Sequence, residues 1–164
     1  MPEFITISDY MKDGLVENGF PEERLAVIPN PVIPKSVSPE KSSDLRTRYG
    51  STEDEQVLGI VGRIARWKGH VEFLKAARKV MQVVPGLKVL IVGDFSDGAS
   101  QYKAEIMRMV EDSGYKQRVI FTGYVKDVER YYRLMDVCVH ASIEPEPFGL
   151  VITEAMACGV PVVA

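Results

Sequence analysis

The sequence lacks the features that mark membrane-spanning, nucleic-acid-binding and secreted proteins. No run of about 18 apolar residues occurs, so no segment has the composition of a membrane span. Basic and acidic side chains are nearly balanced, 20 against 23, and a net charge of -3 offers no positive surface for nucleic acid or an anionic membrane. The first residues carry neither the basic nor the apolar region of a signal peptide. We therefore expect a cytoplasmic protein that does not bind nucleic acid.

Cysteine and histidine are too few and too scattered to predict a metal site. Cys138 and Cys158 lie among apolar neighbours without C-x-x-C spacing, which is typical of small, reduced core residues. His70 and His140 are far apart in the sequence, and no Asp-x-Asp motif occurs. His140 follows an apolar run, so it is either a hydrogen-bonded structural residue or a side chain that points into a crevice.

From residue 57 onward, β-rich runs alternate with amphipathic helical patterns, at residues 70–84 and 101–112. The expected strands are Val57–Val61, Lys88–Val92, Arg118–Phe121, Val137–Val139 and Val160–Val163. This alternation predicts an α/β domain, a Rossmann-like parallel sheet with helices on both faces, whose ligands bind at the carboxyl ends of the strands. No G-x-G-x-x-G follows the first strand, which argues against a dinucleotide-dependent dehydrogenase.

The first third of the chain has a different pattern. Residues 4–8 and 25–28 are expected to form strands around a short helix, and four prolines crowd residues 29–39. Such a proline density predicts an extended connector, and the acidic run at residues 53–55 adds a solvated lead-in to the first strand of the sheet. We therefore divide the chain into residues 1–30, a linker at 31–55 and an α/β domain at 56–164.

The last seventeen residues, 148–164, contain a single charge, Glu154, and a carboxylate in so apolar a stretch needs a partner. Gly149 is expected to open a helix of about two turns, Gly159 to lie just past its end, and Pro161 to prevent its continuation. The unpaired N–H groups near Gly149 and Leu150 would form an anion site, with Glu154 roughly one turn further in. A phosphate that bears a sugar would satisfy both groups.

Three cations, Arg63, Arg66 and Lys68, lie between the first strand of the sheet and a helix that begins near Gly69. Because a helix N-terminus carries about half a positive charge, cations gathered beside it are unfavourable unless an anion occupies the space. The alternative is a solvated basic turn, which is a common feature of loops.

Two glutamates in fixed register carry a family resemblance. Glu146 and Glu154 have seven residues between them and frame Phe148-Gly149, and the motif continues as Ala155-Met156-Ala157-x-Gly159-x-Pro161-Val162. This pattern resembles the signature of the retaining glycosyltransferases of GT-B fold, the glycosyl transferases group 1. The spacing selects Glu146 over Glu144 as the first glutamate of the pair.

The resemblance implies a site for a nucleotide-sugar donor, a UDP- or GDP-sugar, with no metal and no cofactor. Glu154 would hold the ribose hydroxyls, Glu146 would lie beside the donor sugar, and Arg63 and Lys68 would bind the phosphates, whereas Arg66 has no match. The backbone of Tyr124 and Val125 would contact the nucleobase. The implied donor-binding residues are Gly62, Arg63, Lys68, Tyr124, Val125, Glu146, Phe148, Gly149, Leu150 and Glu154, and the implied catalytic residues are Glu146, Arg63 and Lys68.

The resemblance also implies that residues 1–30 are the remnant of an acceptor-binding N-terminal domain and that residues 56–164 are a truncated donor-binding domain. A sugar or lipid-linked acceptor would bind the missing half, so the fragment alone is expected to bind the donor without transferring the sugar. The intact protein could lie at a membrane surface. The uncovered last strand of the fragment favours self-association.

Two other functions remain open. A glycoside hydrolase could use Glu146 and Glu154 as its carboxylate pair, about 5–9.5 Å apart, but a neutral glycoside would leave Arg63 and Lys68 unexplained. A non-catalytic module that binds a nucleotide sugar or pairs with another domain is the other alternative, and the fold alone does not separate these functions. Trp67 and the pair Tyr131-Tyr132 are expected to pack in the core or against a partner domain.

Overall fold

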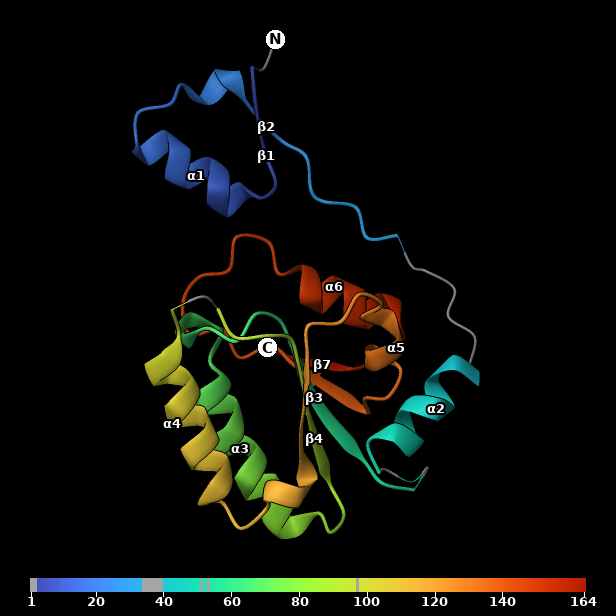
Figure 1. Cartoon of the computed structure of the whole chain (residues 1–164). Coiled ribbons are helices and arrows are strands. Elements are labelled where there is room, and N and C mark those ends of the chain that lie inside the picture. Colours follow the sequence, from blue (N-terminus) through green and yellow to red (C-terminus); the bar gives the residue numbers. More distant parts are fainter. Residues whose placement is uncertain (1–2, 34–39, 51, 53, 97) are drawn as a thin grey trace.

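The computed structural model describes residues 3–33, 40–50, 52, 54–96 and 98–164, and five parallel strands form its main sheet (Figure 1). Their order across the sheet is β5-β4-β3-β6-β7. The strands are β3 (Val57–Val61), β4 (Lys88–Val92), β5 (Val119–Gly123), β6 (Val137–Val139) and β7 (Val162–Val163). The predicted Rossmann-like parallel sheet is therefore confirmed, although β5 runs two residues further and β7 starts two residues later than the sequence indicated.

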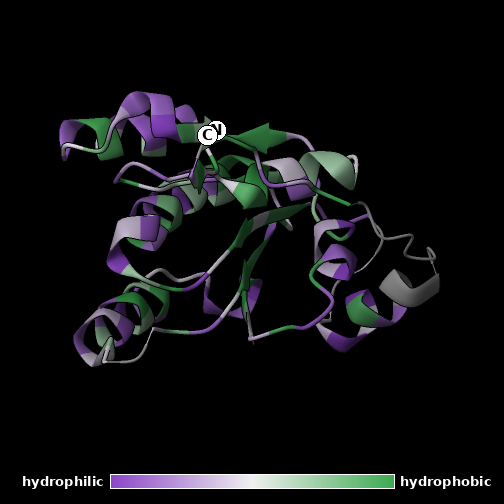
Figure 2. Cartoon of the chain, turned by 90° about the horizontal axis from the view of Figure 1, so that it is seen from above, coloured by the Kyte–Doolittle hydropathy of each residue, from purple (hydrophilic) through white to green (hydrophobic). Residues whose placement is uncertain are grey.

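Helices cover both faces of the sheet, as predicted (Figure 1). One face carries α3 (His70–Val83) and α4 (Ser100–Glu111), and the other carries α2 (Glu40–Arg48), α5 (Glu129–Tyr132) and α6 (Leu150–Ala157). Figure 2 shows hydrophobic residues concentrated on the strands and hydrophilic residues on the outer surfaces of the helices. None of the helices in the described part of the chain is long and apolar enough to cross a membrane.

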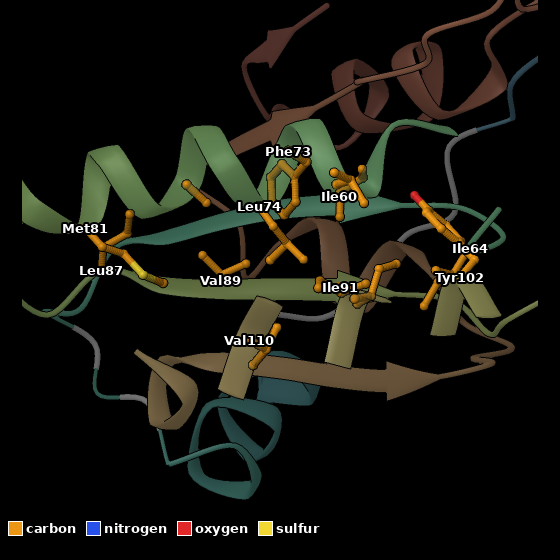
Figure 3. Packing of buried hydrophobic residues seen from close by; sticks show 13 residues of the cluster. Ile60, Ile64, Phe73, Leu74, Met81, Leu87, Val89, Ile91, Tyr102 and Val110 are labelled. Atoms are coloured by element: carbon orange, nitrogen blue, oxygen red, sulfur yellow. The ribbon is translucent and has the colours of Figure 1, made fainter. Parts of the chain in front are cut away.

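Strand β4 divides the core into two halves. Its side chains alternate between the faces, so Val89 and Ile91 pack under α3 and α4 whereas Leu90 and Val92 pack under the helices opposite. All four are at most 1% exposed, and burying each aliphatic side chain contributes about 1.5–3 kcal/mol. Figure 3 shows the first half, with Phe73 and Leu74 directed from α3 toward the strands.

Two short helices, α2 and α5, were not anticipated from the sequence. Helix α2 occupies part of the segment predicted to be an extended linker, residues 31–55, and it docks through Leu45, which is 4% exposed. A nine-residue helix with so little apolar surface gives no periodic signal, because tertiary contact rather than propensity stabilises it. The linker residues 34–39 lie outside the described part of the chain, and the division into domains stays a prediction.

The N-terminal unit consists of β1 (Phe4–Thr6), α1 (Asp9–Glu17) and β2 (Leu25–Val27), in agreement with the predicted two strands around a helix. The two strands pair in parallel. The Ser8 hydroxyl caps α1 by accepting from the Met11 amide, and it also contacts the carbonyl oxygen of Pro147. This contact places the unit beside the loop that follows β6 (Figure 1).

Candidate functional site

The order of the strands defines where a ligand would bind. The chain passes from β3 to β4 to β5 on one side and then returns to place β6 on the other side of β3. In an open parallel sheet, such a reversal leaves a crevice at the carboxyl ends of the two strands that flank it. Here the crevice lies between the loop after β3 and the loop after β6, which are joined by a 2.9 Å hydrogen bond from the Ile143 amide to the Trp67 carbonyl oxygen.

Gly69 allows these two loops to approach. Its φ is +68°, and a Cβ atom at this position would lie 1.7 Å from the carbonyl oxygen of Ala141, far inside van der Waals contact. A residue without a side chain is therefore required where the turn after β3 leads into α3. The close approach brings Lys68, one residue earlier, to the loop after β6.

Lys68 and Glu146 meet in this crevice, although 78 positions separate them in the sequence. The Lys68 ammonium forms an ion pair with Glu146 Oε2, and the two side chains are only 14% and 20% exposed. The Ser142 hydroxyl donates to the same oxygen at 3.2 Å, and His140 Nε2 lies 3.8 Å from it. The indole ring of Trp67 lies beneath the ammonium, with 4.2 Å between Lys68 Nζ and the ring centroid.

The surroundings of His140 keep its imidazole neutral at physiological pH. Partial burial lowers the pKa of His140, and the Lys68 ammonium acts in the same direction, whereas the Glu146 carboxylate opposes them. Of the two roles left open for this histidine, the structure favours the one in the crevice. Ser142 had not been identified from the sequence, because an isolated serine in a loop carries no signal.

A cavity of about 470 Å³ lies at the ends of β3, β4 and β5, next to the crevice. Four of the predicted site residues line it, namely Gly62, Arg63, Tyr124 and Val125. Two of its lining residues approach each other closely through their backbones, since a Cβ atom on Gly93 would lie only 2.0 Å from the Gly62 carbonyl oxygen. Arg63 and Tyr124 are exposed side chains at its rim.

Helix α6 begins as the sequence predicts, with Gly149 at its N-cap at a φ of +77° and Leu150 as its first residue. A Cβ atom on Gly149 would lie 3.8 Å from Glu146 Cγ, so the helix N-terminus adjoins the ion pair. Phe148, directly before it, is half-buried. Leu150 and Glu154 line a second cavity, of about 410 Å³, together with Glu129 and residues 30–33.

The partner that the isolated carboxylate of Glu154 requires is Tyr132. The Tyr132 hydroxyl donates to Glu154 Oε2 at 3.0 Å, and the tyrosine is fully buried. Burial raises the pKa of Tyr132, and the negative charge of Glu154 raises it further, so the phenol stays protonated. Of the two places expected for Tyr132, the core or a contact with a partner domain, the structure shows the core, but the sequence gave no indication that its hydroxyl faces Glu154.

Arg66, the cation without a family match, points elsewhere. It forms a 2.7 Å ion pair with Glu105 on α4 and lies over the ring of Tyr102, with its side chain 64% exposed. Glu146 and Glu154, the carboxylates of the alternative hydrolase, are held by different partners, an ammonium and a phenol. Within the described residues, no cluster of three histidine, cysteine, aspartate or glutamate side chains could hold a metal ion.

Fold and site together define a Rossmann-like α/β domain whose polar and cationic side chains converge at a topological switch point. Glycosyl transferases group 1 is the family that matches residues 41–164, which is most of the chain. The chain therefore belongs to the glycosyl transferases group 1.

Similar proteins and similar solved structures agree with this assignment. The chain is 30% identical to an uncharacterized glycosyltransferase of Methanocaldococcus jannaschii, over 98% of this chain and 41% of that protein. It is 34% identical to the D-inositol 3-phosphate glycosyltransferase of Segniliparus rotundus, over 87% of this chain and 32% of that protein. The structure of Anabaena HepE in complex with UDP-glucose superposes with a TM-score of 0.86 at 32% identity, covering 98% of this chain and 43% of HepE. The chain thus spans less than half the length of these relatives.

Proposed function

We propose that this chain is the donor-binding part of a retaining glycosyltransferase and that it holds a nucleoside diphosphate sugar at the carboxyl ends of the sheet. The observation that carries the proposal is the convergence of Lys68 and Glu146 beside the N-terminus of α6. A cation and a helix N-terminus suit a diphosphate, and a carboxylate next to them suits the hydroxyls of a sugar. The complexes of HepE with UDP and UDP-glucose support a donor of this class.

The proposed chemistry follows from where charge develops. When the bond between the sugar and the diphosphate breaks, negative charge grows on the leaving group and positive charge on the sugar. Lys68, Arg63 and the first N–H groups of α6 would stabilise the leaving group, each donor contributing on the order of 3 kcal/mol. The diphosphate would replace Glu146 as the partner of Lys68, and the released carboxylate would then face the sugar. No step of this scheme requires a metal or a cofactor.

The remaining residues would bind the nucleoside. Tyr124 and Val125, in the cavity at the ends of β3, β4 and β5, would contact the base, and Glu154 would accept hydrogen bonds from the ribose hydroxyls. Arg63 belongs to the same cavity as Tyr124 and Val125, so it would reach the phosphates from the side of the base.

Single alanine substitutions in the basic loop test the phosphate contacts. We expect Lys68→Ala and Arg63→Ala each to weaken binding of the preferred nucleoside diphosphate by roughly tenfold or more, because each removes a charge-assisted hydrogen bond worth about 1.5–3 kcal/mol. The corresponding nucleoside, which lacks phosphates, should bind all variants alike. Isothermal titration calorimetry with UDP, GDP and ADP would identify the preferred diphosphate and measure the losses.

Arg66→Ala is the matched control, since it removes a cation from the same loop that pairs with Glu105 instead of facing the crevice. Equal losses for all three variants would show that only the net charge of the loop matters, and the proposed phosphate site would be refuted.

We also expect this chain alone to bind the donor without transferring its sugar. Because it spans 32–43% of the length of the relatives described above, the positioning of an acceptor, which can contribute about 7–11 kcal/mol, would come from the remainder of such a protein. Incubation with the preferred donor and a panel of sugar and lipid acceptors, analysed by mass spectrometry, tests this expectation. Robust formation of a glycoside by the chain alone would contradict it.

A further inference from the structure

Two adjacent tyrosines at the end of α5 differ in what their hydroxyls contact. Tyr132 is completely buried among Leu90, Cys138 and Ala155, and its hydroxyl donates to Glu154 Oε2 at 3.0 Å. Tyr131 is almost as buried, but its hydroxyl lies 3.5 Å from that of Tyr49 instead of facing Glu154. A buried hydroxyl requires a hydrogen-bond partner, and for Tyr132 this partner is the carboxylate at the second cavity.

The bond from Tyr132 has a defined direction. Burial and the charge of Glu154 keep the phenol protonated, so it can donate, and an ionised carboxylate can only accept. One oxygen of Glu154 is therefore anchored to the core, while the residue itself lines the cavity of about 410 Å³. A glutamate side chain that is already fixed loses less conformational freedom when it binds a ligand than a freely rotating one.

We propose that Tyr132 is a positioning residue for the nucleotide: it fixes Glu154 so that the carboxylate accepts hydrogen bonds from both hydroxyls of a ribose. This inference rests on the proposed function, in which Glu154 contacts the ribose. It makes Tyr132 a determinant of selectivity for ribonucleotides over nucleotides that lack the 2′- and 3′-hydroxyls, although Tyr132 itself touches no ligand.

The test compares two ligands on two variants. The ligands are the tightest-bound of UDP, GDP and ADP and its 2′,3′-dideoxy analogue, measured by calorimetry on the whole chain. Tyr132→Phe removes one oxygen atom, and we expect it to weaken binding of the ribonucleotide about five- to tenfold and to leave the affinity for the dideoxy analogue unchanged. Tyr131→Phe, the neighbouring control, should change neither affinity.

The other possible results of these measurements contradict either the inference about Tyr132 or the proposed function. If Tyr132→Phe weakens binding of both ligands equally, the tyrosine has only a structural role and the inference is wrong, while the proposed function stands. If the unmodified chain binds none of the three diphosphates, the proposed function itself fails. Should Tyr132→Phe not fold, Tyr132→Met, whose flexible side chain fills the space without a donor, provides the same comparison.

The double variant Tyr132→Phe with Glu154→Ala separates a direct from an indirect effect, because alanine leaves no oxygen that could accept from the Tyr132 hydroxyl. If Tyr132 acts through the carboxylate, its substitution should have no further effect on ribonucleotide affinity once Glu154 is an alanine. An undiminished effect of Tyr132→Phe in the Glu154→Ala background would overturn the inference.

Discussion

Gly69→Ala is expected to lower the free energy of unfolding by roughly 3–5 kcal/mol, because it combines a left-handed backbone with a steric overlap. The φ of +68° costs an L-residue about 1–2 kcal/mol. The new Cβ atom, 1.7 Å from the Ala141 carbonyl oxygen, would in addition push the loop after β6 away from the turn after β3. We expect the midpoint of thermal unfolding to fall by roughly ten degrees or more.

Gly114→Ala is the control for this prediction. Gly114 has a similar φ of +75°, but no atom lies within 4 Å of the position of its Cβ, so only the backbone cost of about 1–2 kcal/mol applies. The difference between the free energies of unfolding of the two variants, measured in urea, gives the cost of the steric overlap without the backbone cost. Equal destabilisation would mean that the two loops of the crevice do not need to approach as closely as the structure shows.

A Gly69→Ala protein that still folds should also bind nucleoside diphosphate poorly, because Lys68 and Glu146 would be separated.

The second large effect concerns His70, the first residue of α3, which is 1% exposed. Burial lowers the pKa of His70 to about 4 from 6.5, with a contribution from Lys68 in the same direction and from the Ala65 backbone in the opposite one. The unfolded chain therefore binds a proton between pH 6.5 and 4 that the folded chain does not. Neutral His70 makes its full contribution to the free energy of unfolding above pH 6.5. This contribution decreases as the pH falls, and about 3 kcal/mol of it is lost at pH 4.

His70→Gln, which cannot titrate, measures this contribution. Free energies of unfolding from urea titrations between pH 4 and 7 should rise with pH more steeply for the unmodified chain than for the variant. Identical slopes would show that the pH dependence originates in carboxylates elsewhere and that His70 is not held neutral.

The sequence predicted the sheet because β4 and its neighbours are continuous apolar runs bounded by glycine, and α3 and α4 because their apolar residues recur at helical spacing. Helix α2 was missed because Leu45 is its single buried hydrophobic residue among the side chains described. Local patterns report which residues face a core, and a polar helix held by one side chain has no such pattern.

The candidate site could be predicted only in part for a similar reason. The family motif named Lys68 and Glu146, but it did not indicate that they form an ion pair before a ligand binds. Likewise, the isolation of Glu154 implied a partner without identifying Tyr132, because the two residues lie 22 positions apart on α5 and α6, and only the fold brings these helices together. Contacts between distant segments depend on topology, which spacing in one sequence does not encode.

The strand order also bears on the order in which the molecule folds. Strands β3 and β4 pair across 31 positions, from Val57 to Lys88, whereas β3 and β6 pair across 79, from Leu58 to Val137. In a flexible chain the longer loop would cost about 0.8 kcal/mol more to close. Once β5 has docked on β4, only the connection from residue 124 to 136 remains to be closed, so β6 adds most readily to a preformed three-stranded sheet. The crevice at β3 and β6 would then assemble after β3, β4 and β5 have paired, and a nucleotide bound there would stabilise only the forms of the chain in which β6 has joined the sheet.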